Sequence, residues 1–455
     1  MLFFEFTFLF LFLPLVLAGY RLLPLKLRNP WLLVCSLAFY SASSMRFLPI
    51  LVFSIGVDYV VARRIASSTG PRARLAWLMA SLTTNLGLLA WFKYRAFFAS
   101  SINAVAGTDL PVLAAALPVG ISFYTFQSMS YSIDVYRRAD EPTRDAVLFG
   151  TYVSLFPQLI AGPIVRYSEL REELMALRRP DAAQVVRGII LFSAGLAKKI
   201  LVADTLAAVA APYFARGSVG LLDGWASMLL FAGQIYFDFS GYSDMAIGLG
   251  ALLGFTFPIN FNAPYRAVSF SDFWRRWHMT LSRWLRDYLY IPLGGNQRGP
   301  VRTYLHLMVT MLLGGLWHGA SWNFVLWGGL HGAALATERF LGRRWTGPRP
   351  PRWLASLLVF CVVTLIWVPF KLERLDLVGA WWKAMFGIHG LGQIDAVTAV
   401  TVVGALALFF IPRPTHLWST RASAPKLLLS MGLFFAALVL AYGRAENSPF
   451  LYFRF

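Results

Sequence analysis

The chain has 455 residues, of which 58% are hydrophobic and only 14% are charged, and its formal net charge at pH 7 is +19. A soluble globular protein of this composition would precipitate, so we predict a polytopic membrane protein. The positive charge could also indicate nucleic-acid binding, but the basic residues lie in short segments between apolar stretches. That placement favours anchoring to anionic lipid over binding to nucleic acid.

Apolar stretches long enough to cross a bilayer recur along the whole chain. We expect spans near residues 2–20, 31–62 (as two spans), 75–97, 111–133, 146–161, 184–212, 224–253, 302–337, 353–370, 395–411 and 425–442. Hydropathy therefore predicts about 11 transmembrane helices in an all-α fold. Because no soluble domain fits between them, residues 1–455 are predicted to form a single integral-membrane domain.

The N-terminal stretch differs from a secretory signal, because Glu5 stands where such a signal would have Lys or Arg. We expect it to remain as a helix. Three basic residues, Arg21, Lys26 and Arg28, follow it. The positive-inside rule therefore predicts a periplasmic N-terminus and a cytoplasmic first loop.

Two later segments are unusual for membrane spans. FPQLIAGPIVRY, with Pro157, Gly162 and Pro163, is typical of a broken helix, which is tolerated where it is buried in protein or lines a cavity. Asp238 and Asp244 lie in an otherwise apolar span, where a carboxylate needs a partner or a cavity. We favour hydrogen bonds from Tyr, Ser or an arginine of the 271–290 helix described below, with direct participation in transfer as the alternative.

Residues 255–300 are too polar to cross the bilayer and too aromatic to form a solvated loop. From Ser271, a suitable N-cap followed by Asp272, apolar residues recur at intervals of three and four, which predicts a helix over 271–290. One stripe of this helix contains Trp274, Trp277, His278, Leu281, Trp284, Leu285 and Tyr288. The other side contains Arg275, Arg276, Arg283 and Arg286. We expect this helix to lie in the cytoplasmic interface, with its tryptophans in the membrane and its guanidinium groups toward lipid phosphate.

His318 lies in GGLWHGASWNF, and His331 follows in the same apolar segment. On one continuous helix this separation is about 19 Å of rise and about 140° of rotation, so the two imidazoles are not expected to share a substrate. Gly328 and Gly332 flank His331 at the spacing of a helix-packing motif, so His331 is interpreted mainly as part of a packing face. For His318, catalysis and a structural hydrogen bond between helices both stay open.

Metal chemistry is not expected, because the chain has only six histidines and no HExxH or HxxxH pair. Cys35 and Cys361 both fall in apolar spans and lack CxxC spacing. Neither a disulfide framework nor a zinc site is therefore predicted.

Five segments, in their order and spacing, carry a family resemblance: FPQLIAGPIVRY, YFDFSGYSDMAIGLGALLGF, PINFNAPY, FWRRWHMTLSRWLRDYLYIPLGGN and LLGGLWHGASWNFVLWGGLHG. The chain resembles the membrane-bound O-acyltransferase superfamily and, within it, the membrane subunits of bacterial alginate O-acetyltransferases. The likeness extends from MLFFEFTFLF at one end to FLYFRF at the other. It implies about 11 transmembrane helices, with interfacial and re-entrant helices around a central tunnel and a catalytic core at about 115–340.

The resemblance implies that His318, in the WHG motif, is the catalytic histidine. His278, in RRWH, holds the position where many eukaryotic relatives have Asn or Asp. In the family, both side chains meet in a tunnel that joins the cytoplasmic donor side to the acceptor side. The IPLGGN segment, Ile291 to Asn296, differs from that of the D-alanyl-transferring relatives, which favours acetyl as the transferred group.

Acyl transfer to a hydroxyl needs a base and a group that stabilises the developing oxyanion. We expect His318 to be the base and His278 to orient a substrate or to hydrogen-bond the oxyanion. The expected donor substrate is acetyl-CoA, whose phosphates the arginines of 271–290 could meet, although binding to lipid phosphate explains them equally well; no bound cofactor is expected. Candidate substrate-binding residues are Arg275, Arg276, Trp277, Asp238, Trp317 and Asn323.

The expected function is passage of an acetyl group across the bacterial inner membrane for O-acetylation of an exported polysaccharide, alginate or a similar polymer. The group would reach the sugar directly or through a periplasmic partner acetyltransferase or carrier. One alternative is D-alanyl or other acyl transfer to a cell-envelope polymer. A more distant alternative is a transporter or channel whose histidines relay protons.

Overall fold

The computed structural model describes residues 1–113, 116–216, 219–344, 347–348, 350–411, 414–420, 423–443 and 450–451. Within these ranges all regular secondary structure is helical, as the sequence predicts. By their internal contacts the residues form two compact units, 1–192 with 245–258 and 422–430, and 193–244 with 259–421 and 431–455. The expected single domain over 1–455, with its catalytic core at about 115–340, stays a prediction.

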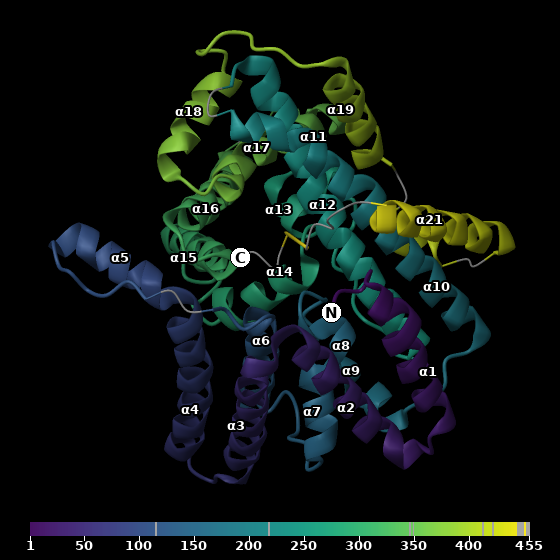
Figure 1. Ribbon diagram of the computed structural model, residues 1–455. Coiled ribbons are helices and arrows are strands. Elements are labelled where there is room, and N and C mark those ends of the chain that lie inside the picture. The colour runs from purple at the N-terminus through teal and green to yellow at the C-terminus, as the bar shows by residue number, and fades with distance from the viewer. Residues whose placement is uncertain are drawn as a thin grey trace. The chain divides into compact units, whose positions relative to one another are not determined.

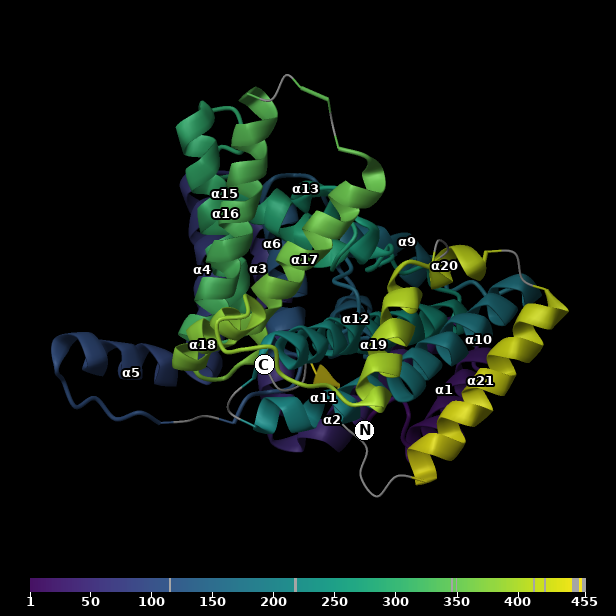
Figure 2. The same cartoon turned by 90° about the horizontal axis from the view of Figure 1, so that it is seen from above.

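The first unit contains most of the N-terminal helices (Figure 1). They are η1 (Thr7–Phe12), α1 (Leu13–Leu22), α2 (Leu25–Ser44), η2 (Met45–Phe47), α3 (Leu48–Ser67), α4 (Pro71–Leu89), η3 (Ala90–Tyr94), α5 (Arg95–Ala106), α6 (Ile121–Tyr136), α7 (Ala146–Ser154), α8 (Phe156–Leu159), α9 (Tyr167–Ala176) and most of α10 (Ala182–Ala197). Helices α3, α4 and α6 pack on one another. In contrast, α5 buries none of its residues and projects beyond the end of α4 (Figures 1 and 2).

A buried carboxylate joins α3, α4 and α6. Asp58 of α3 accepts hydrogen bonds from Asn85 Nδ2 at 2.8 Å, from Ser132 Oγ at 3.1 Å and from Ser81 Oγ. A polar group withdrawn from water is costly unless it is hydrogen-bonded, so these neutral donors explain how Asp58 is accommodated inside the unit.

The second unit contains the helices that carry both candidate histidines. They are η4 (Lys198–Ala203), α11 (Asp204–Ala215), α12 (Leu221–Leu252, whose last turns belong to the first unit), η5 (Pro264–Arg266), α13 (Phe270–Trp274), α14 (Met279–Leu285), η6 (Arg286–Tyr290), α15 (Pro300–His318), α16 (Trp322–Arg344), α17 (Arg352–Lys371), α18 (Leu375–Met385), α19 (Ala396–Phe409), α20 (Thr415–Trp418) and most of α21 (Ala424–Gly443).

Four helical stretches among the described residues are long and apolar enough to cross a membrane: Leu25–Ser67, Pro71–Ala106, Arg352–Lys371 and Ala424–Gly443. The helices at Thr7–Leu22 and Ala396–Phe409 are apolar but shorter. The number of about 11 spans therefore stays a prediction.

The FPQLIAGPIVRY segment is broken, as predicted. Helix α7 ends at Ser154, the single turn α8 follows, and α9 starts only at Tyr167. Pro157 and Gly162 are buried, and a Cβ added to Gly162 would lie 2.4 Å from Gln158 Cα. The chain therefore turns here within protein, where irregular backbone is tolerated at membrane depth.

Candidate active site

His318 is the last residue of α15, in a hairpin formed by α15 and α16. The two helices pack through glycines, because a Cβ on Gly315 would lie 2.2 Å from Phe324 O and one on Gly328 would lie 2.2 Å from Met311 O. Side chains at these positions would force the backbones apart. The glycines around His318 therefore serve close helix packing, which holds the imidazole at a defined height in the hairpin.

His278 interrupts the helix predicted over 271–290. Its backbone is left-handed, with φ 41° and ψ 53°, and it stands between α13 and α14. The prediction of one continuous helix is therefore wrong, as is Ser271 as its N-cap: the N-cap is Ser269, whose side chain accepts a hydrogen bond from Asp272 N at 3.0 Å. Helices of five and seven residues are too short to span a bilayer.

The apolar stripe of this segment is nevertheless buried. Trp277 and His278 have no exposed surface, and Leu281, Trp284, Leu285 and Tyr288 are also buried. The stripe packs on protein, since the ring of Trp277 lies 5.0 Å from that of Trp367 in α17 and 5.1 Å from that of Phe261. Contact of the whole tryptophan stripe with the membrane was thus a wrong expectation, because α17 and the 259–265 loop cover the face.

His278 and His318 lie next to each other, with ring centroids 6.3 Å apart and ring planes at 61°. Both are buried. Trp317 lies against both imidazoles, 5.0 Å from His318 and 6.0 Å from His278, and Phe239 meets His278 at 4.7 Å. The chain thus brings together two titratable rings, 40 residues apart in sequence, within aromatic walls.

Asn260, which the sequence argument did not select, orients His278. Its Oδ1 lies 3.2 Å from His278 Nδ1 and accepts hydrogen bonds from Thr280 N at 3.3 Å and Thr280 Oγ1 at 3.0 Å. A backbone N–H can only donate, so it identifies this atom of the amide as the oxygen. His278 Nδ1 must then carry the proton, which leaves the lone pair of a neutral imidazole on Nε2.

Burial lowers the pKa of His278 to about 3, so this imidazole is neutral at physiological pH. In that state Nε2 can accept a hydrogen bond and cannot donate one. Of the two roles expected for His278, orientation of a hydroxyl group fits this tautomer, whereas donation to an oxyanion does not.

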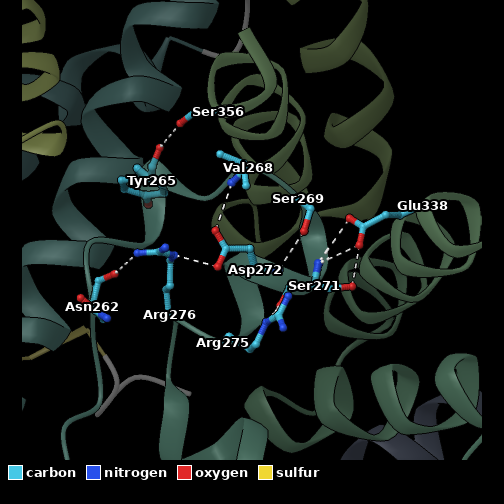
Figure 3. A network of polar contacts seen from close by, with 10 residues as sticks. All are labelled: Asn262, Tyr265, Val268, Ser269, Ser271, Asp272, Arg275, Arg276, Glu338 and Ser356. Atoms are coloured by element: carbon cyan, nitrogen blue, oxygen red, sulfur yellow. Dashed lines mark hydrogen bonds and ion pairs between the residues drawn. The ribbon is translucent and has the colours of Figure 1, made fainter. Parts of the chain in front are cut away.

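Arg275 and Arg276 of this segment form hydrogen bonds with nearby residues (Figure 3). Arg276 Nε donates to Asp272 Oδ1 at 2.9 Å, and its Nη1 donates to Asn262 O at 3.3 Å. Arg275 is exposed and donates to Ser271 O at 3.2 Å. Arg275 therefore lies on the exposed side of the segment, whereas Arg276 is partly buried and contacts the 259–265 loop. Binding of either arginine to a substrate stays a prediction.

Comparison with known families decides the class of this protein. The sequence model of the membrane-bound O-acyltransferase family (MBOAT) matches residues 82–372 of this chain. The chain belongs to the membrane-bound O-acyltransferase family. Family membership and the apolar helices identify it as an acyltransferase in a membrane.

Relatives cover nearly the whole chain. "Probable alginate O-acetylase AlgI" of Azotobacter vinelandii is 39% identical, over 99% of both chains. "Peptidoglycan O-acetyltransferase" of Helicobacter pylori is 34% identical, over 98% of this chain and 96% of its own. "Teichoic acid D-alanyltransferase" of Streptococcus thermophilus is 26% identical and covers 58% of this chain and 70% of its own.

In this O-acyltransferase, His331 and His318 do not share one helix, so the continuous span assumed over 302–337 is wrong. The chain reverses at Gly319–Ser321, and α16 returns beside α15. Both imidazoles therefore contact the ring of Trp327, His318 at 5.0 Å and His331 at 4.7 Å. His331 is fully buried and forms part of the wall behind His318, and Gly328 packs closely as expected.

Asp238 and Asp244 of the O-acyltransferase pair with lysines, and not with the partners expected. Asp238 Oδ1 lies 2.7 Å from Lys199 Nζ, which also contacts Asp204 Oδ1 at 2.8 Å. Asp244 Oδ2 lies 2.6 Å from Lys198 Nζ. Because Asp238 also accepts a hydrogen bond from Leu451 N at 2.8 Å, its contacts are those of a structural ion pair.

Asn323 also forms a structural contact between two parts of the fold. It is buried, and its Nδ2 donates to Leu372 O at 2.6 Å, which fastens the start of α16 to the residue after α17. Among the described residues, no hydrogen bond or ion pair joins Asn323 or Asp238 to His278 or His318. Their roles in substrate binding stay predictions.

No group of three or more metal-ligating His, Cys, Asp or Glu side chains occurs within the described part of the chain. Cys35 and Cys361 are free thiols.

Proposed function

We propose that this enzyme transfers an acetyl group from acetyl-CoA, on the cytoplasmic side, toward an exported polysaccharide, alginate or a similar polymer. The group reaches the sugar directly or through a periplasmic partner acetyltransferase or carrier. The adjacency of His278 and His318, at 6.3 Å between ring centroids, is the observation that supports this chemistry most directly. The names of the relatives, an alginate O-acetylase and a peptidoglycan O-acetyltransferase, support the acetyl group and the polymeric acceptor.

In the proposed reaction, His318 accepts the proton of the acceptor hydroxyl as its oxygen attacks the thioester carbonyl carbon. His278, neutral and oriented by Asn260, accepts a hydrogen bond from a substrate hydroxyl through Nε2. The tetrahedral intermediate collapses with cleavage of the carbon–sulfur bond. The imidazolium of His318 returns the proton to the leaving thiolate, so the products are the acetyl ester and the free CoA thiol.

For such transfer across a bilayer, we infer about 11 spans around a central tunnel in the bacterial inner membrane, with a periplasmic N-terminus. The positive-inside rule supports this orientation through Arg21, Lys26 and Arg28. Both histidines would line the tunnel, which would open to the cytoplasm near Arg275 or Arg276.

D-alanyl transfer is the second candidate, because a teichoic acid D-alanyltransferase is among the relatives. Its lower identity of 26%, and the IPLGGN segment, favour acetyl. A transporter or channel without covalent chemistry is not consistent with membership of an acyltransferase family.

The test is release of CoA thiol by the purified full-length protein supplied with acetyl-CoA, with His318→Ala as the matched control. We expect time-dependent release by the parent protein and background release by the variant. Equal release from both would contradict the role of His318. Release from a D-alanyl thioester but none from acetyl-CoA would contradict the donor.

A further inference from the structure

Two hollows adjoin each other in the second unit, on the side of α13 where α16 and α17 approach. One has a volume of about 830 Å³ and the other about 880 Å³. They share the lining residues Val268, Ser269, Glu338, Gly342, Pro350 and Ala355. They therefore form one continuous open depression, which we call the α16–α17 groove.

One end of the α16–α17 groove is cationic. Arg339 and Arg352 line it, and neither forms an ion pair with another described residue. Arg339 Nε is buried and has no hydrogen-bond partner among the described residues. Buried donors are almost always satisfied, so this guanidinium is suited to an anionic partner.

The nearby carboxylate does not neutralise these arginines, because Glu338 is turned toward the start of α13 (Figure 3). It accepts hydrogen bonds from Ser271 Oγ at 2.5 Å, from Ser271 N at 3.3 Å and from Phe270 N. Glu338 thus acts as a clamp between α16 and the segment that leads to His278, and the arginines remain available to a ligand.

The other end of the α16–α17 groove is apolar. Its lining includes Ala334, Leu341, Leu358, Val359 and Val362. From Arg352 to Val362 the axis of α17 rises about 15 Å, which is half of the roughly 30 Å hydrocarbon core of a bilayer. Because α17 is one of the helices apolar enough to span a membrane, the groove follows it from an arginine end to about mid-membrane depth.

We propose that the α16–α17 groove binds one phospholipid with an anionic head group. Its phosphate lies at Arg339 and Arg352, and one acyl chain lies along α17 among the alanine, leucine and valine side chains. Charge complementarity selects the head group, and the depth of about one leaflet selects a lipid chain over a soluble anion, which would leave the apolar end unfilled. This site is separate from the acetyl-transfer chemistry and does not depend on the proposed function.

The first test measures lipid retained by the full-length protein, by native mass spectrometry after transfer from nanodiscs of phosphatidylcholine with added phosphatidylglycerol. Each arginine near a membrane surface strengthens binding to anionic lipid. Removal of both in Arg339→Gln with Arg352→Gln should therefore lower the affinity for phosphatidylglycerol roughly 30-fold. The matched control is Arg343→Gln with Arg344→Gln, which removes the same charge from exposed positions outside the groove. Equal losses in both double variants would overturn the site.

A second pair of variants leaves the charge unchanged. Leu358 lines the groove and Leu357, its neighbour in α17, does not, although both are exposed. Leu358→Trp should fill the apolar end and reduce the retained phosphatidylglycerol, whereas Leu357→Trp should retain as much as the parent. If Leu358→Trp retains the lipid fully, no acyl chain occupies the groove. This pair also keeps the proposal testable if the arginine double variant does not fold.

The source of the phosphate is distinguished by adding inorganic phosphate or CoA to the protein in phosphatidylcholine nanodiscs and measuring Tm. We expect phosphatidylglycerol to raise Tm in the parent protein and not in the Arg339→Gln, Arg352→Gln variant, and inorganic phosphate to have no effect. CoA also binds at the proposed donor site, so any rise in Tm with CoA should be equal in both proteins. A rise with inorganic phosphate, or a rise with CoA that the variant loses, together with none from phosphatidylglycerol, would show that the arginines bind a soluble anion and would overturn the lipid.

Discussion

Asn260 Oδ1 and His278 Nδ1 lie 3.2 Å apart, although 18 residues of chain separate them. The same oxygen is held by both donors of Thr280, and Asn260 Nδ2 donates to Ser243 Oγ at 3.2 Å. The amide therefore cannot turn without breaking several hydrogen bonds at once. This arrangement sets both the ring orientation and the tautomer of His278, and it makes the neutral Nε2 an acceptor.

Replacement of His318 should abolish acetyl transfer. His318→Ala removes the proton acceptor, and loss of a general base typically costs about 10²- to 10⁴-fold in rate. His318→Gln should be nearly as inactive, because an amide does not titrate. Polymer acetylation in a complemented deletion strain measures the effect, with membrane insertion of the variant as the control; near-normal acetylation would show that another group accepts the proton.

His278 should tolerate one substitution better than another. His278→Ala should be severely impaired, while His278→Asn should retain measurable transfer, because Asn offers a hydrogen bond and also accepts the left-handed backbone more readily than Ala. Transfer rates of the two purified variants provide the measurement, and the Tm of each variant shows whether it is folded. A folded His278→Asn protein with no activity would assign His278 a role in proton transfer.

Asn260 variants should change the rate without changing substrate affinity. Asn260→Ala frees the ring of His278 to rotate, and misplacement of a reacting group costs about 10²-fold in rate, so kcat should fall with little change in KM. Steady-state kinetics with acetyl-CoA test this. A rise in KM with unchanged kcat would instead indicate that Asn260 contacts the donor.

The pH profile of Asn260→Asp should differ from that of the parent. Burial lowers the pKa of His278 to about 3, so the parent should show no acid-side loss from this residue near neutral pH. A carboxylate beside Nδ1 stabilises the imidazolium and raises that pKa. Once Nε2 is protonated it can no longer accept a hydrogen bond from the substrate. The activity of Asn260→Asp should therefore be lost at a higher pH than the activity of the parent protein. Identical pH–activity profiles of the two proteins below neutral pH would contradict the hydrogen bond between Asn260 and His278.

The ion pairs of Lys199 predict a contrast in stability. Lys199→Met leaves Asp204 and Asp238 buried without their cation, which should destabilise the protein by about 3 to 5 kcal/mol. Asp238→Asn preserves the pair of Lys199 with Asp204 and should cost about 1 kcal/mol. Tm in detergent compares the two. An Asp238→Asn protein with normal Tm but no transfer would support the predicted role of Asp238 in substrate binding.

Features carried by local pattern could be predicted from the sequence. The helical class, the broken helix around Pro157 and Gly162, and the grouping of apolar residues on one face of the 277–288 segment follow from hydropathy and from periods of three and four. The break at His278 could not, because the short helices on either side keep the apolar residues on one face, and a histidine with positive φ is uncommon.

Features that depend on distant pairing were missed for a different reason. Lys199 and Asp238 meet although 39 residues separate them, and neither has a local signal that names the other. Asn260 lies in an irregular loop, so periodicity gives it no orientation; its only signal was its place in the PINFNAPY segment. The reversal at Gly319–Ser321 was missed because hydropathy averages across a three-residue turn between two apolar helices.

The contact of Gly315 and Gly328 has a consequence for the distance between the two histidines. Backbones that touch this closely cannot slide past each other, so α15 and α16 move only as one rigid body that carries both His318 and Glu338. A change in the separation of His278 and His318 therefore requires the 270–290 segment to move relative to the hairpin. The hydrogen bonds between Glu338 and Ser271 oppose that movement and so help to keep the two imidazoles at one separation.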